Sequence, residues 1–230
     1  MDDVRKNNVP SKNQVEKSVI EERSASGNVK ILFIGNSMTF HGENAAIGWN
    51  NAWGMAASAK EKDYVHVLGA MLSEHGINAD KCIVNVADWE RGYKDGEAVL
   101  RSGIYDEARA FSPDIIIIRI LENCPADGFD ASAFHDELLK LVDYFNPDKK
   151  ARVILSTSFW RHEGSAVMEQ VAAELGASCA EMTDLGDKDE MKAIGKFEHG
   201  GVALHPGDLG MESMALRFLP LVLEEIKNME

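Results

Sequence analysis

The chain has 230 residues, of which 45% are hydrophobic, and its formal net charge is −14. This length and apolar content suffice for one α/β domain with a complete core. An acidic chain without a Lys/Arg-rich run is repelled by phosphate backbones, so we expect no nucleic acid partner. No run of 18 apolar residues occurs, so we expect no membrane partner either.

The N-terminal segment has no apolar leader, so the sequence as it stands predicts a cytoplasmic protein. A secreted or periplasmic protein whose signal peptide has been removed would have the same sequence. Three cysteines at wide spacing (Cys82, Cys124 and Cys179) favour neither a disulfide framework nor a metal site. The histidines also lack metal-ligand spacing, so we expect neither a metal nor an organic cofactor.

Residues 1–27 are polar and lack apolar periodicity, which predicts a mobile arm with one helical turn around Val15–Glu22. Residues 28–230 are expected to form the folded domain, in which strand-like and helix-like patterns alternate. The strand-like segments are Lys30–Ile34, Lys81–Val86, Asp114–Ile120, Arg152–Ser156 and Ser178–Met182. The helix-like segments are Lys62–His75, Gly96–Phe111, Ala131–Phe145, Ser165–Leu175 and Gly210–Lys227. This order predicts a single three-layer α/β/α domain with a five-stranded parallel sheet.

The first strand ends abruptly in Gly35-Asn36-Ser37. Ser37 is therefore expected at the carboxyl edge of the sheet, where open α/β sheets bind their ligands. His205 lies in a Pro/Gly loop just before the last helix and can reach the same edge. A serine with a histidine base is the minimum arrangement for an activated oxygen nucleophile. The alternative for Ser37 is a helix N-cap, a position that serine also favours.

Three short blocks in this order resemble the SGNH (GDSL-like) hydrolase superfamily: Gly35–Thr39, Leu121–Asn123 and His205–Met211. The resemblance spans residues 30–227 and implies a flavodoxin-like fold and ester hydrolysis. It also implies that Ser37 is the nucleophile, His205 its base, and the Asn123 amide a donor to the oxyanion. Asn36 stands where these proteins more often have Asp.

Two positions depart from the family pattern. Glu90 occupies the position of a glycine whose N–H helps to bind the oxyanion, so the Glu90 N–H is the expected donor there. Val202 occupies the position of the acid that usually precedes the histidine by three residues. Orientation of His205 by a backbone carbonyl is the favoured hypothesis, since the third group only fixes the tautomer and stabilises the imidazolium. A carboxylate from Asp208 or Glu198, or a weakened site, are the alternatives.

All four tryptophans follow predicted strands on the same edge as Ser37, together with several charged residues. Aromatic rings stack on sugar faces, and charged groups bond hydroxyls or a carboxylate, so these residues are candidate substrate ligands. They are Trp49, Trp53, Trp89, Trp160, Glu122 and Arg161. Alternatively, Trp49 and Trp53 pack an insertion against the domain. The long connection 41–64 is typical of a binding loop or lid.

The sequence thus predicts an esterase that removes short acyl groups, preferably acetyl, from a carbohydrate or another small polar substrate. Two alternatives remain open. One is a lipid or thioester hydrolase on the same fold. The other is a carbohydrate-binding protein without activity, in which Val202 marks a degenerate triad.

Overall fold

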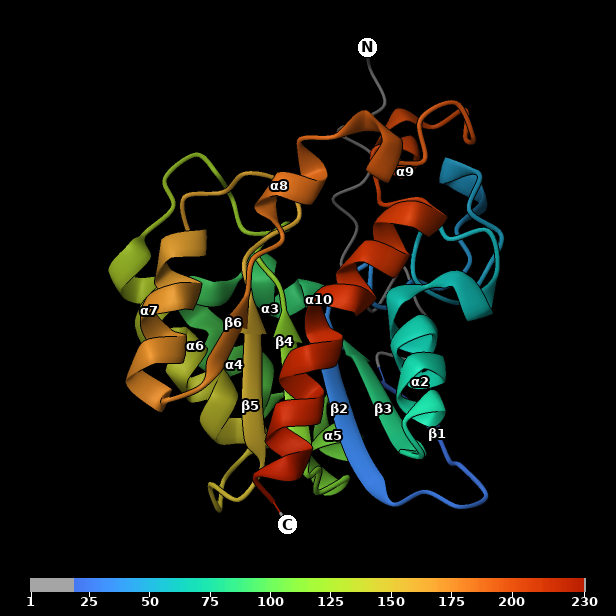
Figure 1. Cartoon of the computed structure of the whole chain (residues 1–230). Helices are drawn as coiled ribbons and strands as arrows, with labels where there is room; N and C mark the ends of the chain where they lie inside the picture. Colours follow the sequence, from blue (N-terminus) through green and yellow to red (C-terminus); the bar gives the residue numbers. More distant parts are fainter. Residues whose placement is uncertain (1–18, 230) are drawn as a thin grey trace.

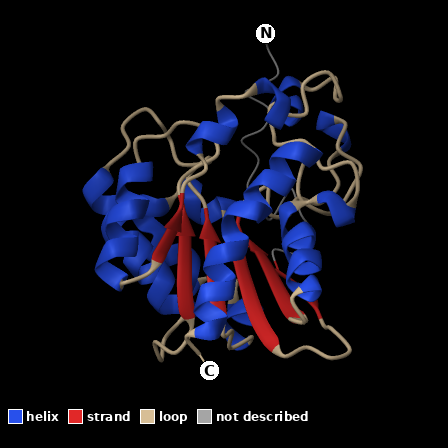
Figure 2. Cartoon of the chain, viewed as in Figure 1, coloured by secondary structure: helices blue, strands red, loops and turns tan. Residues whose placement is uncertain are grey.

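Six strands form one sheet between two layers of helices in the computed structural model, which describes residues 19–229 (Figures 1 and 2). Five of the strands are parallel, and the sixth, β1, is antiparallel to its neighbour β3. The strands are β1 Val19–Glu22, β2 Val29–Gly35, β3 Ala79–Asn85, β4 Ile115–Arg119, β5 Arg152–Ser156 and β6 Ser178–Ala180. The predicted α/β/α class with five parallel strands is confirmed, and the strand count rises by one.

Strand β1 corrects the interpretation of the N-terminal segment, which predicted a helical turn around Val15–Glu22. Residues 1–18 lie outside the described residues, whereas Val19–Glu22 pairs along β3. Glu22 is tied by ion pairs to Lys60, Lys81 and His66. These partners are distant in sequence, so no local pattern in Val-Ile-Glu-Glu predicts the strand.

The sheet order is β1-β3-β2-β4-β5-β6. The first parallel strand, β2, thus lies between β3 and β4. The chain passes from β2 to β3 on one side, and then crosses to β4 on the other side of β2. This is the flavodoxin-like order, in which the crevice outside the carboxyl ends of the two central strands is the usual ligand site. Ser37 follows β2 and Asn123 follows β4, so both residues lie at this switch point.

The two faces of the sheet are covered by different helices. Ile31 and Phe33 of β2 pack with α2 (Tyr64–Glu74) and α10 (Asp208–Lys227), which lie in front of the sheet in Figure 1. Leu32 and Ile34 pack in a second core on the opposite face. The helices of that face are α3 Ala87–Arg91, α4 Gly96–Arg101, α5 Asp106–Ala110, α6 Ala131–Phe145 and α7 Ser165–Leu175. Burial on both faces explains the continuous apolar strands.

Local signals set several helix boundaries. Asp63 and Asp130 cap the N-termini of α2 and α6 through their carboxylates, as expected for acidic N-caps. The helix predicted over 96–111 is two helices, α4 and α5, because Gly103 between them has φ 80°. The short helices α8 (Thr183–Gly186) and α9 (Gly200–Ala203) lie in connections at the carboxyl edge of the sheet (Figure 1). None of the helices within residues 19–229 is long and apolar enough to cross a membrane.

Candidate active site

Ser37 lies in the turn that directly follows β2. The carbonyl of Asn36 accepts hydrogen bonds from the N–H groups of Thr39 (2.9 Å) and Phe40 (3.0 Å), which reverses the chain. Gly35 is required before this turn, because a Cβ there would lie 1.8 Å from Thr39 Oγ1 and 3.0 Å from the Arg119 carbonyl. The turn therefore exposes the Ser37 hydroxyl at the sheet edge.

His205 is brought to Ser37 by the loop between α9 and α10. The His205 carbonyl accepts from Ala193 N–H at 2.9 Å, and the Gly207 N–H donates to the Met191 carbonyl at 2.9 Å. These bonds fix the loop, and the Ser37 Oγ then lies 2.8 Å from His205 Nε2. The two atoms are thus within the 2.6–3.2 Å range expected of a nucleophile and its base.

The other ring nitrogen, Nδ1, lies 2.7 Å from the carbonyl oxygen of Gly201. A carbonyl only accepts hydrogen bonds, so Nδ1 carries the proton and Nε2 is left to accept from the Ser37 hydroxyl. Val202 packs in an apolar cluster, and Asp208 accepts from the N–H and hydroxyl of Ser58 at 2.8 and 2.6 Å. Glu198 is exposed. The group that orients His205 is therefore a backbone carbonyl.

Burial lowers the pKa of His205 to about 4, although its bond to the Gly201 carbonyl acts in the opposite direction. Only a neutral imidazole can accept a proton from a serine hydroxyl, so we expect His205 to stay able to act as a base well below pH 6.5. If the chain hydrolyses esters through Ser37, the acid limb of its kcat/KM profile is expected near pH 4. Initial rates with a short-chain aryl ester between pH 3.5 and 8 measure this limb.

Glu90→Gln is the control for that profile, since Glu90 is a buried acid beside the site and burial raises its pKa. The variant should keep the same midpoint. A midpoint near the ordinary histidine value in the wild type would contradict the assignment, because it would indicate a solvated His205 or one paired with a carboxylate.

A buried cluster of charged and amide groups lies next to Ser37. The Asn36 amide donates to Glu90 Oε1 at 3.1 Å and to Glu122 Oε2 at 2.7 Å, while its carbonyl oxygen accepts from Arg119. Arg119 Nη1 also pairs with Glu122 Oε1 at 2.6 Å. An amide can donate to both carboxylates, whereas an aspartate at position 36 would add a third negative charge. The cluster thus explains the Asn in Gly35-Asn36-Ser37.

The two carboxylates of this cluster differ in electrostatics. Burial raises the pKa of Glu90, and the nearby charge of Glu122 adds to the effect. Burial alone would also raise the pKa of Glu122, but the Arg119 guanidinium holds it below its usual range. The contacts on both Glu90 oxygens come from N–H donors, as an ionised carboxylate requires.

Asn123 lies beside Ser37 and belongs to the same cavity. Its Nδ2 group donates to Glu90 Oε2 at 2.9 Å, which leaves the second Nδ2 hydrogen for another acceptor. The Ser37 N–H has no hydrogen-bond partner among the described residues. The predicted third donor is wrong, because the Glu90 N–H donates at 3.0 Å to the carbonyl of Val86, the N-cap residue of α3. Glu90 contributes its side chain instead.

Ser37, Asn123 and His205 line a small cavity of about 60 Å³. The lining includes both apolar and polar side chains. The other lining residues are His41, Asn44, Ile47, Met55, Ala87 and Arg91. Burial lowers the pKa of His41 to about 4, and the neighbouring Arg91 charge acts in the same direction. Both histidines are therefore neutral near pH 7, and Arg91 is the charged residue among the described residues that line this cavity.

The tryptophans do not form the predicted rim. Trp49 and Trp89 are completely buried, so their rings cannot stack on a ligand. Trp49 packs against Trp53 and donates to the His41 carbonyl at 3.1 Å, as the packing alternative predicted. Trp53 is half-buried and donates to the Ala57 carbonyl at 2.9 Å. Trp160 lies edge-on to the His205 ring, with 5.2 Å between the ring centroids.

The two charged candidates also differ from expectation. Glu122 is enclosed in the buried cluster and also accepts the Phe159 N–H at 2.8 Å, so it is not placed to bind substrate. Arg161 is exposed and pairs with Asp187, away from the cavity lining. Sequence reasoning missed the orienting role of Gly201, for which no side-chain signal exists. It also gave no site role to Asn36, whose position directly after the first parallel strand was the available clue.

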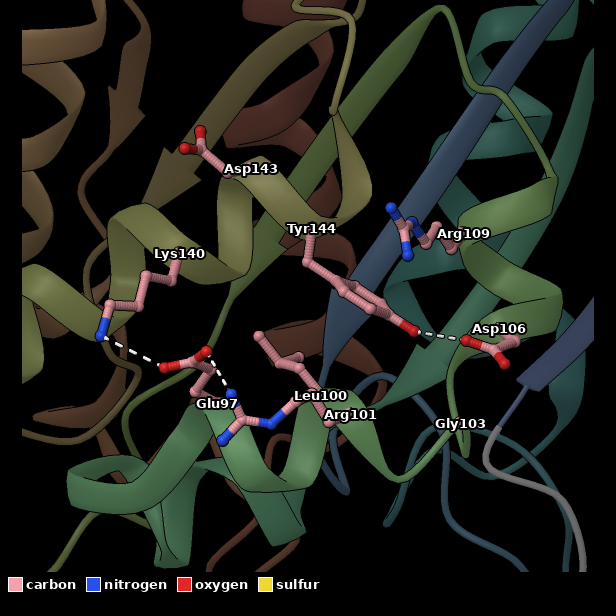
Figure 3. A pocket seen from close by; sticks show the side chains of 9 residues that line it. All are labelled: Glu97, Leu100, Arg101, Gly103, Asp106, Arg109, Lys140, Asp143 and Tyr144. Atoms are coloured by element: carbon pink, nitrogen blue, oxygen red, sulfur yellow. Dashed lines mark hydrogen bonds and ion pairs between the residues drawn. The ribbon is translucent and has the colours of Figure 1, made fainter.

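A cavity larger than the one at Ser37 lies elsewhere in the described part of the chain. It measures about 500 Å³ and lies between α4, α5 and α6 (Figure 3). Its charges are satisfied locally: Glu97 contacts Arg101 and Lys140, and Asp106 accepts from the Tyr144 hydroxyl at 2.8 Å. It contains no histidine, serine or cysteine, so we do not place chemistry there. Among residues 19–229, no group of three or more His, Cys, Asp or Glu side chains could hold a metal ion.

Solved structures match the chain over most of its length. Esterase EstA from Pseudoalteromonas sp., inhibited by monoethylphosphonate, matches with a TM-score of 0.54 and 14% identity, over 87% of this chain and 98% of its own. A protein assigned as a GDSL-like lipase from Parabacteroides merdae matches with a TM-score of 0.54 and 15% identity, over 86% of this chain and 97% of its own. The chain has the fold of GDSL-type hydrolases. The resemblance seen in the sequence is thus confirmed at the level of the fold.

A third match is a two-domain esterase active on acetylated mannans, whose structure contains mannopentaose. Its TM-score is 0.50 at 16% identity, over 86% of this chain and 49% of that longer chain. No family model matches the sequence, and the search of curated proteins found no match.

Proposed function

We propose that this protein is a serine esterase that removes short acyl groups, preferably acetyl, from a carbohydrate or another small polar substrate. The observation that carries the proposal is the chain of two contacts from Ser37 Oγ to His205 Nε2 (2.8 Å) and from His205 Nδ1 to the Gly201 carbonyl (2.7 Å). A serine that only capped a helix would not need a buried histidine with its second nitrogen so fixed.

In the proposed reaction, Ser37 Oγ attacks the ester carbonyl while its proton passes to His205 Nε2. The Ser37 N–H and the Asn123 amide donate to the oxyanion, and such donors are worth about 3–4 kcal/mol each in the transition state. Collapse of this intermediate expels the alcohol, which takes the proton from His205. Water, deprotonated by His205, then attacks the acyl-serine, and Ser37 recovers its proton as the carboxylic acid leaves.

The size of the cavity supports a short acyl group. Its volume of about 60 Å³ is far below the roughly 300 Å³ at which sites for drug-sized ligands begin. The fold shared with an esterase active on acetylated mannans favours an acetylated carbohydrate among the candidate substrates. Trp160, which lies edge-on to the His205 ring, is the aromatic residue that we propose to contact the substrate.

A fluorophosphonate probe tests the proposal, since it forms a stable adduct only with an activated serine. We expect one adduct per chain, located on Ser37 by peptide mass spectrometry, and its loss in His205→Ala. The absence of an adduct on a folded protein would contradict the proposal and favour a binding protein without activity.

The runner-up is a lipid or thioester hydrolase. Leu204 and Leu209 flank His205 in sequence and are each 48% exposed, which provides an apolar surface beside the base. A series of p-nitrophenyl esters from acetate to palmitate distinguishes the two. Our proposal requires kcat/KM to be highest for acetate or propionate, and a maximum at eight or more carbons would favour the runner-up.

A further inference from the structure

Two consecutive residues of α3 contact opposite ends of the Asn123 side-chain amide. Glu90 Oε2 accepts from Asn123 Nδ2 at 2.9 Å, and Arg91 Nη2 donates to Asn123 Oδ1 at 3.3 Å. The amide is thus held between an acceptor on its nitrogen side and a donor on its oxygen side.

We propose that Glu90 and Arg91 are positioning residues that fix the orientation of the Asn123 amide, so that its free N–H is presented to the oxyanion. The inference rests on the proposed function, in which Asn123 is an oxyanion donor. The inference adds that two side chains of the short helix α3 hold this donor in place.

An asparagine amide needs such support because its oxygen and nitrogen ends have nearly the same shape. If the amide rotated by half a turn, Oδ1 would face the developing oxyanion and repel it. A carboxylate can only accept and a guanidinium can only donate. Rotation would therefore pair Oδ1 with the Glu90 carboxylate and Nδ2 with the Arg91 guanidinium, which is unfavourable at both ends.

The same carboxylate also fixes the backbone that carries Asn123. Glu90 Oε1 accepts the N–H groups of Leu121 (2.6 Å) and Asn123 (3.3 Å). Leu121 has φ 115°, a conformation that a leucine adopts only at a cost. The Glu90 carboxylate is fully buried and is also bound by the Asn36 amide, so these contacts fix its position beside the Asn123 amide.

Arg91 also offsets the charge that Glu90 brings. A carboxylate this close to the Asn123 amide would by itself oppose an oxyanion at the same amide. Arg91 places a positive charge on the other side of that amide and lines the Ser37 cavity. Arg91 Nη1 also forms an ion pair with Asp88 at 3.7 Å, which holds the guanidinium on this side of the amide.

A double-mutant cycle on kcat tests the inference in the full-length protein with a short-chain aryl ester. Asn123→Ala should lower kcat by about 10²-fold or more, as for loss of one oxyanion donor. Glu90→Gln and Arg91→Met should each lower kcat by about 10-fold to 100-fold, as for a misplaced donor, with KM changed much less. In the Asn123→Ala background, either substitution should lower kcat by no more than about 3-fold.

Glu97→Gln and Arg101→Met provide matched controls, because this ion pair lies on the next helix, α4, with both side chains exposed. Titration with the fluorophosphonate counts competent sites, so kcat can be corrected for unfolded protein. If Glu90→Gln does not fold, the cycle is measured with Arg91→Met and Asn123→Ala. The Arg91 side chain is partly exposed, so its substitution should be tolerated by the fold.

Multiplicative effects of the α3 and Asn123 substitutions would overturn the inference, as would losses that appear only in KM. These outcomes differ from failure of the proposed function. If the proposed function fails, Ser37→Ala retains the wild-type rate of hydrolysis, whereas failure of this inference alone leaves a rate that still depends on Ser37.

Discussion

Substitution of Ser37 by alanine is expected to lower kcat for a short-chain ester by about 10⁴-fold to 10⁶-fold, the range found when a catalytic serine is removed. The physical reason is that no acyl-enzyme can form without Oγ, while the oxyanion donors and the cavity remain. Steady-state rates of the purified variant, compared with the uncatalysed rate, measure the loss. Thermal unfolding should be nearly unchanged, since only the contact of Oγ with His205 is removed.

Ser73→Ala is the matched control for this experiment. Ser73 is an exposed serine of α2 whose hydroxyl donates to the Gly69 carbonyl at 3.1 Å, and it should retain full activity. Hydrolysis that survives Ser37→Ala would mean that another group or a bound water is the nucleophile. The Ser37–His205 contact would then have to be explained as structural.

Local sequence pattern predicted most of the fold, because the strands are buried on both faces and therefore consist of continuous apolar runs. Ile115–Ile118, for example, is fully buried in β4. Strand β1 escaped prediction because its stability depends on β3 and on the cations around Glu22. The break between α4 and α5 was missed because one glycine at positive φ does not alter the apolar pattern on either side.

The residues brought together at the site were predictable where topology decides their place. Ser37 and Asn123 follow neighbouring parallel strands, so the sheet itself brings them together. The carbonyl that orients His205 was not identifiable, since every residue has one and only the path of the loop selects Gly201. Trp49 and Trp89 occur at the predicted edge, but residue type does not show which way a loop side chain points. Both are fully buried.

Arg119→Met is expected to lower the free energy of unfolding by about 3–5 kcal/mol near neutral pH, the usual cost of removing one partner of a buried ion pair. Arg119 is fully buried between Glu122 and Asn36, and its loss leaves the Glu122 carboxylate without the cation that contacts it. Urea unfolding of wild type and variant at pH 7.5 measures the difference.

The pH dependence of this loss separates its electrostatic part from a packing defect. Without Arg119, the pKa of Glu122 in the folded state should rise above its unfolded value, because burial is then the dominant effect. The destabilisation is therefore largest above the folded pKa, and it decreases as the pH falls through that value towards the unfolded pKa. Adding Glu122→Gln to Arg119→Met should recover part of the loss at neutral pH.

Arg161→Met, which breaks an exposed pair with Asp187, should leave the unfolding curve unchanged within error. If Arg119→Met were as stable as Arg161→Met, the buried ion pair of Arg119 with Glu122 would not contribute to the stability of the fold beside Ser37.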